Sequence, residues 1–201
     1  MIGKEEQAMK QDIVSALRPV IVMELLCAML LGLAYPLALL GLGQTIFPHQ
    51  ANGSLVIERG RIVGSELIGQ SFTGETYVHG RPSAAGQGYD GSASSGSNLG
   101  PTSRALADRV GADVAALRAG GSKRAIPGDL VTSSASGLDP DISPEAALYQ
   151  VDRIARARAI PPDRVRQIIA AETRDAMLGV FGEPRINVLA LNRRLDAERT
   201  P

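Results

Sequence analysis

The chain contains few aromatic and few metal-binding side chains. Only 3% of its 201 residues are aromatic and none is tryptophan, so platforms on which nucleic-acid bases stack are scarce. Two histidines and a single cysteine, Cys27, are too few for a convincing zinc site or for a disulfide framework within one chain. Basic and acidic residues balance at 21 each, so no excess of charge points to nucleic acid.

Two segments resemble nucleotide-binding motifs, but neither has the features that such a site requires. Residues 86–91 spell G-x-G-x-x-G, but the strand before and the helix after that a dinucleotide site needs are not indicated. Residues 69–76 approach a phosphate-binding loop with Glu75 in the lysine position, where a carboxylate repels phosphate. We therefore predict that the chain binds no nucleotide through these segments.

The remaining polar candidates are interpreted as structural. His79 could belong to a Ser-His-acid triad, but no serine of the chain stands in a G-x-S-x-G elbow. We therefore favour a surface or structural role for His79. Asp139 and Asp141 lack the spacing of a calcium loop. They are expected to stabilise the turn before a helix that starts at Ser143-Pro144-Glu145, where Ser is a good N-cap and Pro a good first residue.

What the chain does contain is one long apolar run. Val20 to Leu42 is 23 residues with Glu24 as its only charge, and a helix of that length spans roughly 34 Å. This length crosses the ~30 Å hydrocarbon core of a bilayer, exceeds the core of a signal peptide, and has no clear cleavage site after it. We predict a transmembrane helix over residues 13–43, with a cytoplasmic segment 1–12 and a soluble extracytoplasmic domain 44–201.

The orientation follows from the basic residues. Lys4, Lys10 and Arg18 precede the run, and the next basic residue after it is Arg59. By the positive-inside rule the N-terminus is expected in the cytoplasm and the domain outside.

Several residues of the run are candidates for helix packing. Glu24 either pairs with a partner helix or, as we favour, snorkels toward the headgroups from near the helix end. Pro36 is expected to kink the helix. The small-xxx-small pairs that permit close approach of neighbouring helices are Ala28 with Gly32 and Ala34 with Ala38.

The soluble part has an α+β pattern, with a small sheet and about four helices. A hairpin is predicted around Arg59-Gly60, continuing over 67–76, and a further short strand over 129–132. Helical periodicity follows Pro101, Ser143 and Pro162 and covers 188–197. Between them, residues 80–100 form a Gly/Ser-rich stretch typical of a functional loop or a linker.

At this point long stretches of the sequence resemble a known family, KdpC, the small subunit of the bacterial Kdp potassium-transporting ATPase. The resemblance covers residues 10–199 in order. The matching stretches are Leu17-Arg18-Pro19, Tyr35-Pro36-Leu37, FPHQANGSL from Phe47, LIGQSFTGETYVHGRPSA from Leu67, GSNLGPTS from Gly96, LVTSSASGLDPDISPEAALYQVDRIARAR from Leu130, and GEPRINVLALN from Gly182.

The resemblance implies a non-catalytic subunit of an ATP-driven potassium uptake complex in the bacterial inner membrane. Its implied partners are a channel-like potassium-selecting subunit, a P-type ATPase subunit and a small peptide subunit. ATP and potassium are then handled by the partners, and no cofactor is bound directly. The family is described both as an assembly subunit and as a catalytic chaperone that raises ATP affinity. An extracytoplasmic domain cannot touch cytoplasmic ATP, so the second role requires coupling between distant sites.

We expect the domain to lean on the channel-like subunit. Contact residues are predicted in the loop and in the SGLDPDISP segment, although the same residues would also suit rigid turns; they are Arg81, Pro82, Ser83, Gly96, Ser97, Asn98, Leu99, Gly137, Leu138 and Asp139. Two alternatives stay open, a membrane-anchored extracytoplasmic scaffold and a hydrolase, both independent of an ATPase.

Overall fold

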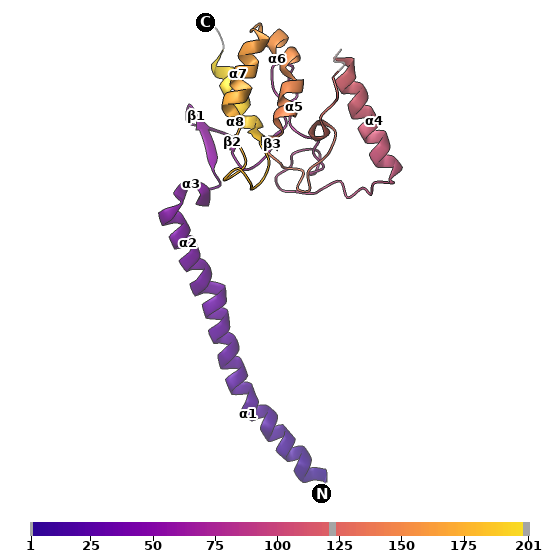
Figure 1. Cartoon of the computed structure of the whole chain (residues 1–201). Helices are drawn as coiled ribbons and strands as arrows, with labels where there is room; N and C mark the ends of the chain where they lie inside the picture. The colour runs from indigo at the N-terminus through magenta and orange to yellow at the C-terminus, as the bar shows by residue number, and fades with distance from the viewer. Residues whose placement is uncertain (1, 121–123, 199–201) are drawn as a thin grey trace. The chain divides into compact units, whose positions relative to one another are not determined.

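The computed structural model describes residues 2–120 and 124–198, with side chains from Val14 on. The chain divides into two compact units that meet between Ser54 and Leu55. The first is helical, and the second combines two short sheets with helices (Figure 1). The α+β class with one N-terminal membrane-length helix is confirmed.

The first unit is one long helix with a local change of winding. Helix α1 spans Ile2–Met29, a π-helical turn spans Leu30–Ala34, and α2 spans Tyr35–Ile46. The π turn lies directly ahead of Pro36, which has no N–H to donate, and Tyr35 donates its N–H five residues back to Leu30. The irregularity expected at Pro36 thus takes the form of a π turn, which accommodates the backbone hydrogen bond that proline cannot donate. A short helix α3, Pro48–Ala51, follows.

Residues Val14–Ile46 are long and apolar enough to cross a membrane. Their apolar side chains are exposed in the isolated chain, as expected for a surface that lipid or neighbouring helices would cover.

The second unit begins with the predicted hairpin. Strands β1 (Leu55–Glu58) and β2 (Arg61–Ser65) pair antiparallel, and Arg59 and Gly60 both have positive φ. This is the backbone of a tight two-residue hairpin turn. The predicted continuation of the sheet over 67–76 is wrong, because that segment forms no strand beyond an isolated bridge between Ser65 and Ile68.

The core is made by the C-terminal helices. These are α5 (Pro144–Tyr149), α6 (Val151–Arg158), α7 (Pro162–Glu172) and α8 (Val188–Ala197), with β3 (Asp141–Ile142) and β4 (Ile186–Asn187) paired antiparallel beside them. Ser143 caps α5 through its hydroxyl, which accepts from the N–H of Ala146. The apolar faces predicted for these helices are buried, with Ile154, Val165, Leu191 and Leu195 fully enclosed.

Helix α4 (Arg104–Ala119) is the exception. It has no fully buried residue and stands apart from α5–α8 in Figure 1. Only Leu117, near its C-terminal end, packs against the core cluster. The strand predicted over 129–132 is also wrong, since Gly128–Leu130 form a 3-10 turn. There Asp129 accepts from the N–H of Ser143 and helps start α5.

Candidate functional site

An irregular segment without a strand partner, residues 74–79, begins with a turn in which the N–H of Tyr77 donates to the Gly74 carbonyl. Side chains from the helices and from the α5–α6 junction hold it in place. The N–H of Val78 donates to Asn192 Oδ1 over 2.7 Å, and Asn192 Nδ2 donates back to the Val78 carbonyl over 2.9 Å. Gln150 makes the same pair of bonds with the backbone of His79, at 2.9 and 3.0 Å. Two amide side chains thus replace the ladder that a neighbouring strand would supply.

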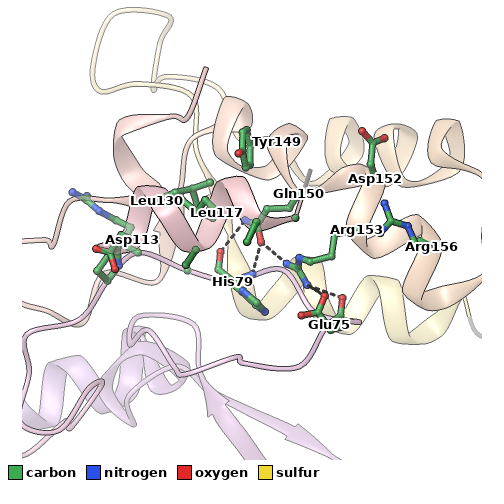
Figure 2. A pocket seen from close by; sticks show the side chains of 16 residues that line it. Glu75, His79, Asp113, Leu117, Leu130, Tyr149, Gln150, Asp152, Arg153 and Arg156 are labelled. Carbon is green, nitrogen blue, oxygen red and sulfur yellow. Dashed lines mark hydrogen bonds and ion pairs between the residues drawn. The ribbon is translucent and has the colours of Figure 1, made fainter. Parts of the chain in front are cut away.

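Two arginines fix the rest of this segment. Arg153 donates to the carbonyls of Glu75 and Tyr77 and to Gln150 Oε1 (Figure 2). Arg158 donates to the Thr76 carbonyl and to the Leu195 carbonyl, and its guanidinium lies 5.4 Å from the centre of the Tyr77 ring. An ion pair of 2.9 Å with Asp196 completes the set. The backbone of 74–78 is therefore clamped to α6 and α8.

His79 sits in this network as a structural residue. Its Nε2 lies 3.0 Å from the Gly74 carbonyl, so that nitrogen carries the hydrogen and donates. Burial, and then the nearby charge of Arg153, lower the pKa of the ring below its usual 6.5. Because Nε2 is committed to a carbonyl and a cation opposes protonation, this geometry does not favour a general base that activates a serine.

The loop that follows is ordered by its contacts with the turn at 135–139. Arg81 forms an ion pair of 2.9 Å with Asp139, and the Ser83 hydroxyl donates to the Gly137 carbonyl over 2.6 Å. The Tyr89 hydroxyl donates to the carbonyl of Arg81 over 2.7 Å, and burial, then the charge of Asp139, raise its pKa. Loop and turn thus form one rigid surface.

Gly137 is where the two segments approach most closely. Its φ is +67°, and an added Cβ would lie 2.6 Å from both the N atom of Ala85 and the carbonyl O of Ser95. Ala85 itself is fully buried. Only glycine fits here, for steric and conformational reasons together.

The structure thus brings part of the predicted contact set together. Arg81, Pro82 and Ser83 meet Gly137, Leu138 and Asp139, and most of their polar groups are used within the domain. Gly96 packs against the backbone of Ala135. Asn98 and Leu99, beyond it, point outward and are exposed. The turn is closed by the Asp139 carboxylate, which accepts from the N–H of Asp141 over 3.0 Å, so the predicted turn role is confirmed for Asp139. The Asp141 carboxylate instead contacts Asn187 and Arg185.

A cleft of about 740 Å³ lies beside the clamped segment, between α4 and the α5–α6 pair. Figure 2 labels residues of both signs around it, including Asp113, Asp152, Arg153 and Arg156. The Tyr149 hydroxyl is buried there and has no hydrogen-bond partner within residues 2–120 and 124–198. Among the described residues, no group of three or more His, Cys, Asp and Glu side chains is placed to hold a metal ion.

The packing candidates in the first unit all lie on the membrane-length helix. Glu24 and Ala28 belong to α1, Gly32 and Ala34 to the π turn, and Pro36 and Ala38 to α2. All six are exposed, and a Cβ on Gly32 would meet nothing within 4 Å. A neighbouring helix thus has free access to this surface.

Reasoning from sequence missed the residues that do most to hold the loop, Gln150, Arg153, Arg158 and Asn192. Arg153 and Arg158 stand in α6 and Asn192 in α8, helices with clear apolar periodicity, and Gln150 joins α5 to α6. A polar residue within such a face, as Asn192 is between Leu191 and Leu195, is a signal that a buried partner exists.

Fold and site together define a small α+β domain, ordered by buried side-chain bonds and carried on one candidate membrane span. The family described as "KdpC: K+-transporting ATPase, c chain" matches residues 17–197. The chain therefore belongs to the KdpC family of potassium-transporting ATPase subunits.

Individual relatives are similar in sequence to this chain over nearly its whole length. A "Potassium-transporting ATPase KdpC subunit" of Caulobacter vibrioides is 56% identical, covering 93% of this chain and 95% of the relative. The subunits of the same name from Methylorubrum extorquens and Acidobacterium capsulatum are 55% and 54% identical, covering 88% and 90% of this chain and 94% and 97% of their own lengths.

Proposed function

We propose that this chain is a non-catalytic subunit that assembles and stabilises an ATP-driven potassium uptake complex. Family membership over residues 17–197 carries the proposal. In this proposal the candidate membrane span, Val14–Ile46, anchors the subunit in the bacterial inner membrane. Its partners in this proposal are a channel-like potassium-selecting subunit, a P-type ATPase subunit and a small peptide subunit, and the first two handle potassium and ATP.

The loop and turn held together through residues 81–83 and 137–139, which are buried or half-buried, support a role in presenting an ordered surface to a partner. A surface that is already ordered loses little conformational entropy when it docks. Asn98 and Leu99 project from the same loop, and 37% of Leu99 is exposed. In this proposal they face the channel-like subunit on the extracytoplasmic side, and any effect on ATP affinity reaches the ATPase subunit by coupling between sites.

Co-purification from native membranes in mild detergent tests the assembly role. A C-terminally tagged chain should recover a P-type ATPase and a channel-like protein, and deletion of the subunit should abolish potassium-stimulated ATP hydrolysis. Leu99→Glu should weaken recovery of the channel-like protein, whereas Val63→Glu, at 36% exposure in β2, should not. Recovery of the chain alone in several detergents would contradict the proposal.

Topology is tested separately. On a Cys27→Ala background, a cysteine replacing Asp163, whose side chain is 87% exposed, should react with a membrane-impermeant maleimide in intact spheroplasts. Labelling that appears only after permeabilisation would place the domain in the cytoplasm and would reopen direct contact with ATP.

A further inference from the structure

The segment between α7 and β4 is a second hairpin with an apolar tip. The backbones of Arg174 and Arg185 exchange two hydrogen bonds of 2.9 Å each, and Met177 and Phe181 pair again nearer the tip, with N–H to carbonyl distances of 2.9 and 3.0 Å. A tight turn at Leu178 and Gly179, both with positive φ, closes it. We call residues 174–185 the tip hairpin.

The tip exposes large apolar side chains on both sides of Gly179. The exposed fractions are 66% for Met177, 84% for Leu178, 75% for Val180 and 61% for Phe181. Single exposed apolar residues are common on soluble surfaces, but a contiguous cluster marks an interaction site. This cluster contributes nothing to the domain's own core, since none of the four side chains is buried.

The base of the tip hairpin lies at the end of the domain where the chain enters from the anchor. Leu55, the first residue of the second unit, is paired with Ser65, and the next carbonyl, that of Glu66, accepts from Asn187 Nδ2 over 2.9 Å. Asn187 stands two residues after the end of the hairpin at Arg185. More apolar side chains are exposed beside this entry point, 40% for Leu55, 60% for Leu67 and 42% for Ile68.

The tether to the membrane is short. From Ile46, where the membrane-length helix ends, to Leu55 there are nine residue steps, which reach at most roughly 30 Å when fully extended. Four of the intervening residues are coiled into α3, which shortens the reach further. The entry end of the domain is therefore confined to the neighbourhood of the bilayer surface, whichever side of the membrane the domain occupies.

We propose that the tip hairpin inserts Met177, Leu178, Val180 and Phe181 into the interfacial layer of the same bilayer that holds the anchor. The charges of the hairpin cancel, because Arg174 and Arg185 are balanced by Asp175 and Glu183. Apolar burial rather than attraction to anionic headgroups drives the insertion, which should reach about 5–10 Å below the surface as for other interfacial elements. A lipid surface is favoured over a protein groove because the short tether keeps the entry end of the domain, where the base of the hairpin lies, within reach of the bilayer.

The test uses the full chain reconstituted without partners into phosphatidylcholine vesicles. On the Cys27→Ala background, an environment-sensitive fluorophore is attached at Leu178→Cys, with Asp163→Cys as the control at similar exposure. Val180→Cys is a second probe that leaves the positive-φ residue unchanged. We expect blue-shifted emission at both tip positions and quenching by lipids that carry a nitroxide at a shallow acyl position, with neither at Asp163→Cys.

Anionic lipid or added salt should change this quenching little, since the hairpin has no net charge. Equal, weak quenching at tip and control positions would overturn the proposal. So would a tip probe that shifts only when the partner subunits are present and that stays inaccessible to lipid quenchers, which would assign the hairpin to a protein interface. The vesicle measurement itself is made on the chain without partners, so lipid quenching at the tip can be present or absent whether or not the chain assembles with an ATPase, and its result is distinguishable from that of the co-purification test above.

Discussion

Asn192 binds both backbone groups of Val78 with one amide, across 114 positions of sequence. Both residues are buried, at 1% and 0% exposure. An amide oxygen and an amide nitrogen are placed as a backbone carbonyl and N–H would be in a strand. The contact therefore fixes where the irregular segment 74–79 lies against α8.

Replacing Asn192 with leucine should destabilise the domain strongly. Two buried backbone groups of Val78 would lose their partners, at about 1–3 kcal/mol each. Urea unfolding of the full chain in detergent measures the loss. Arg193→Ala, on the same helix but with an exposed ion pair to Glu58, is the matched control and should change stability by less than about 1 kcal/mol. Similar losses in both variants would show that the Asn192 bonds add nothing specific.

Replacing Gly137 with alanine should loosen the loop. The left-handed backbone costs on the order of 1–3 kcal/mol for a residue that does not favour it, and the new methyl would collide with the backbone of Ala85 and Ser95. We expect lower thermal stability and faster proteolysis within residues 80–100. Gly91→Ala, in the same loop with open space around it, should behave as the parent chain does, and a protease-resistant loop in Gly137→Ala would contradict the packing described.

Stability should fall on mild acidification because of His79. Its pKa is lower in the folded chain than the usual 6.5, so the unfolded chain binds the proton more tightly. His79 therefore does not affect stability above about pH 6.5. Stability falls as the pH drops through that value and levels off below the pKa of His79 in the folded chain. Unfolding midpoints measured from about pH 7.5 to about pH 5 should show a smaller slope in His79→Gln. Burial, then the charge of Asp139, raise the pKa of Asp141, which acts in the opposite direction, but comparison of the two variants at each pH removes its effect. Identical slopes would exclude His79 as the source.

A large side chain should affect assembly with the partner subunits at one glycine of the membrane-length helix and not at another. Gly32→Leu fills the small-residue position four residues after Ala28 on the same helix face and should reduce recovery of the partner subunits, because close helix approach needs small side chains. Gly41→Leu lies in α2 with equally open surroundings and serves as the control.

Replacing Glu24 with glutamine should leave recovery of the partner subunits unchanged, because a carboxylate that snorkels toward the headgroups makes no contact with a partner helix. A loss of recovery would show instead that Glu24 pairs with a neighbouring helix.

Periodicity and local turn chemistry determined much of this fold. Four features could be predicted because each depends on residues close together in sequence. They are the membrane-length run, the hairpin at Arg59-Gly60, the cap at Ser143 and the apolar faces of α6, α7 and α8. Family membership followed from long matching stretches. The two strand predictions that failed, over 67–76 and 129–132, had no sustained alternation of apolar and polar residues, so the pattern could not distinguish a strand from an irregular segment.

Only the tertiary structure decided what satisfies the backbone of those segments. The partners of 74–79 are Gln150, Arg153, Arg158 and Asn192, more than 70 positions away in sequence, and no local rule links them. Likewise Gly137 is required because two distant loops meet there. The sequence determined the helices, the anchor and the family, since these rest on local pattern and on similarity, whereas long-range hydrogen bonds placed the irregular loop and formed the surface proposed to bind a partner.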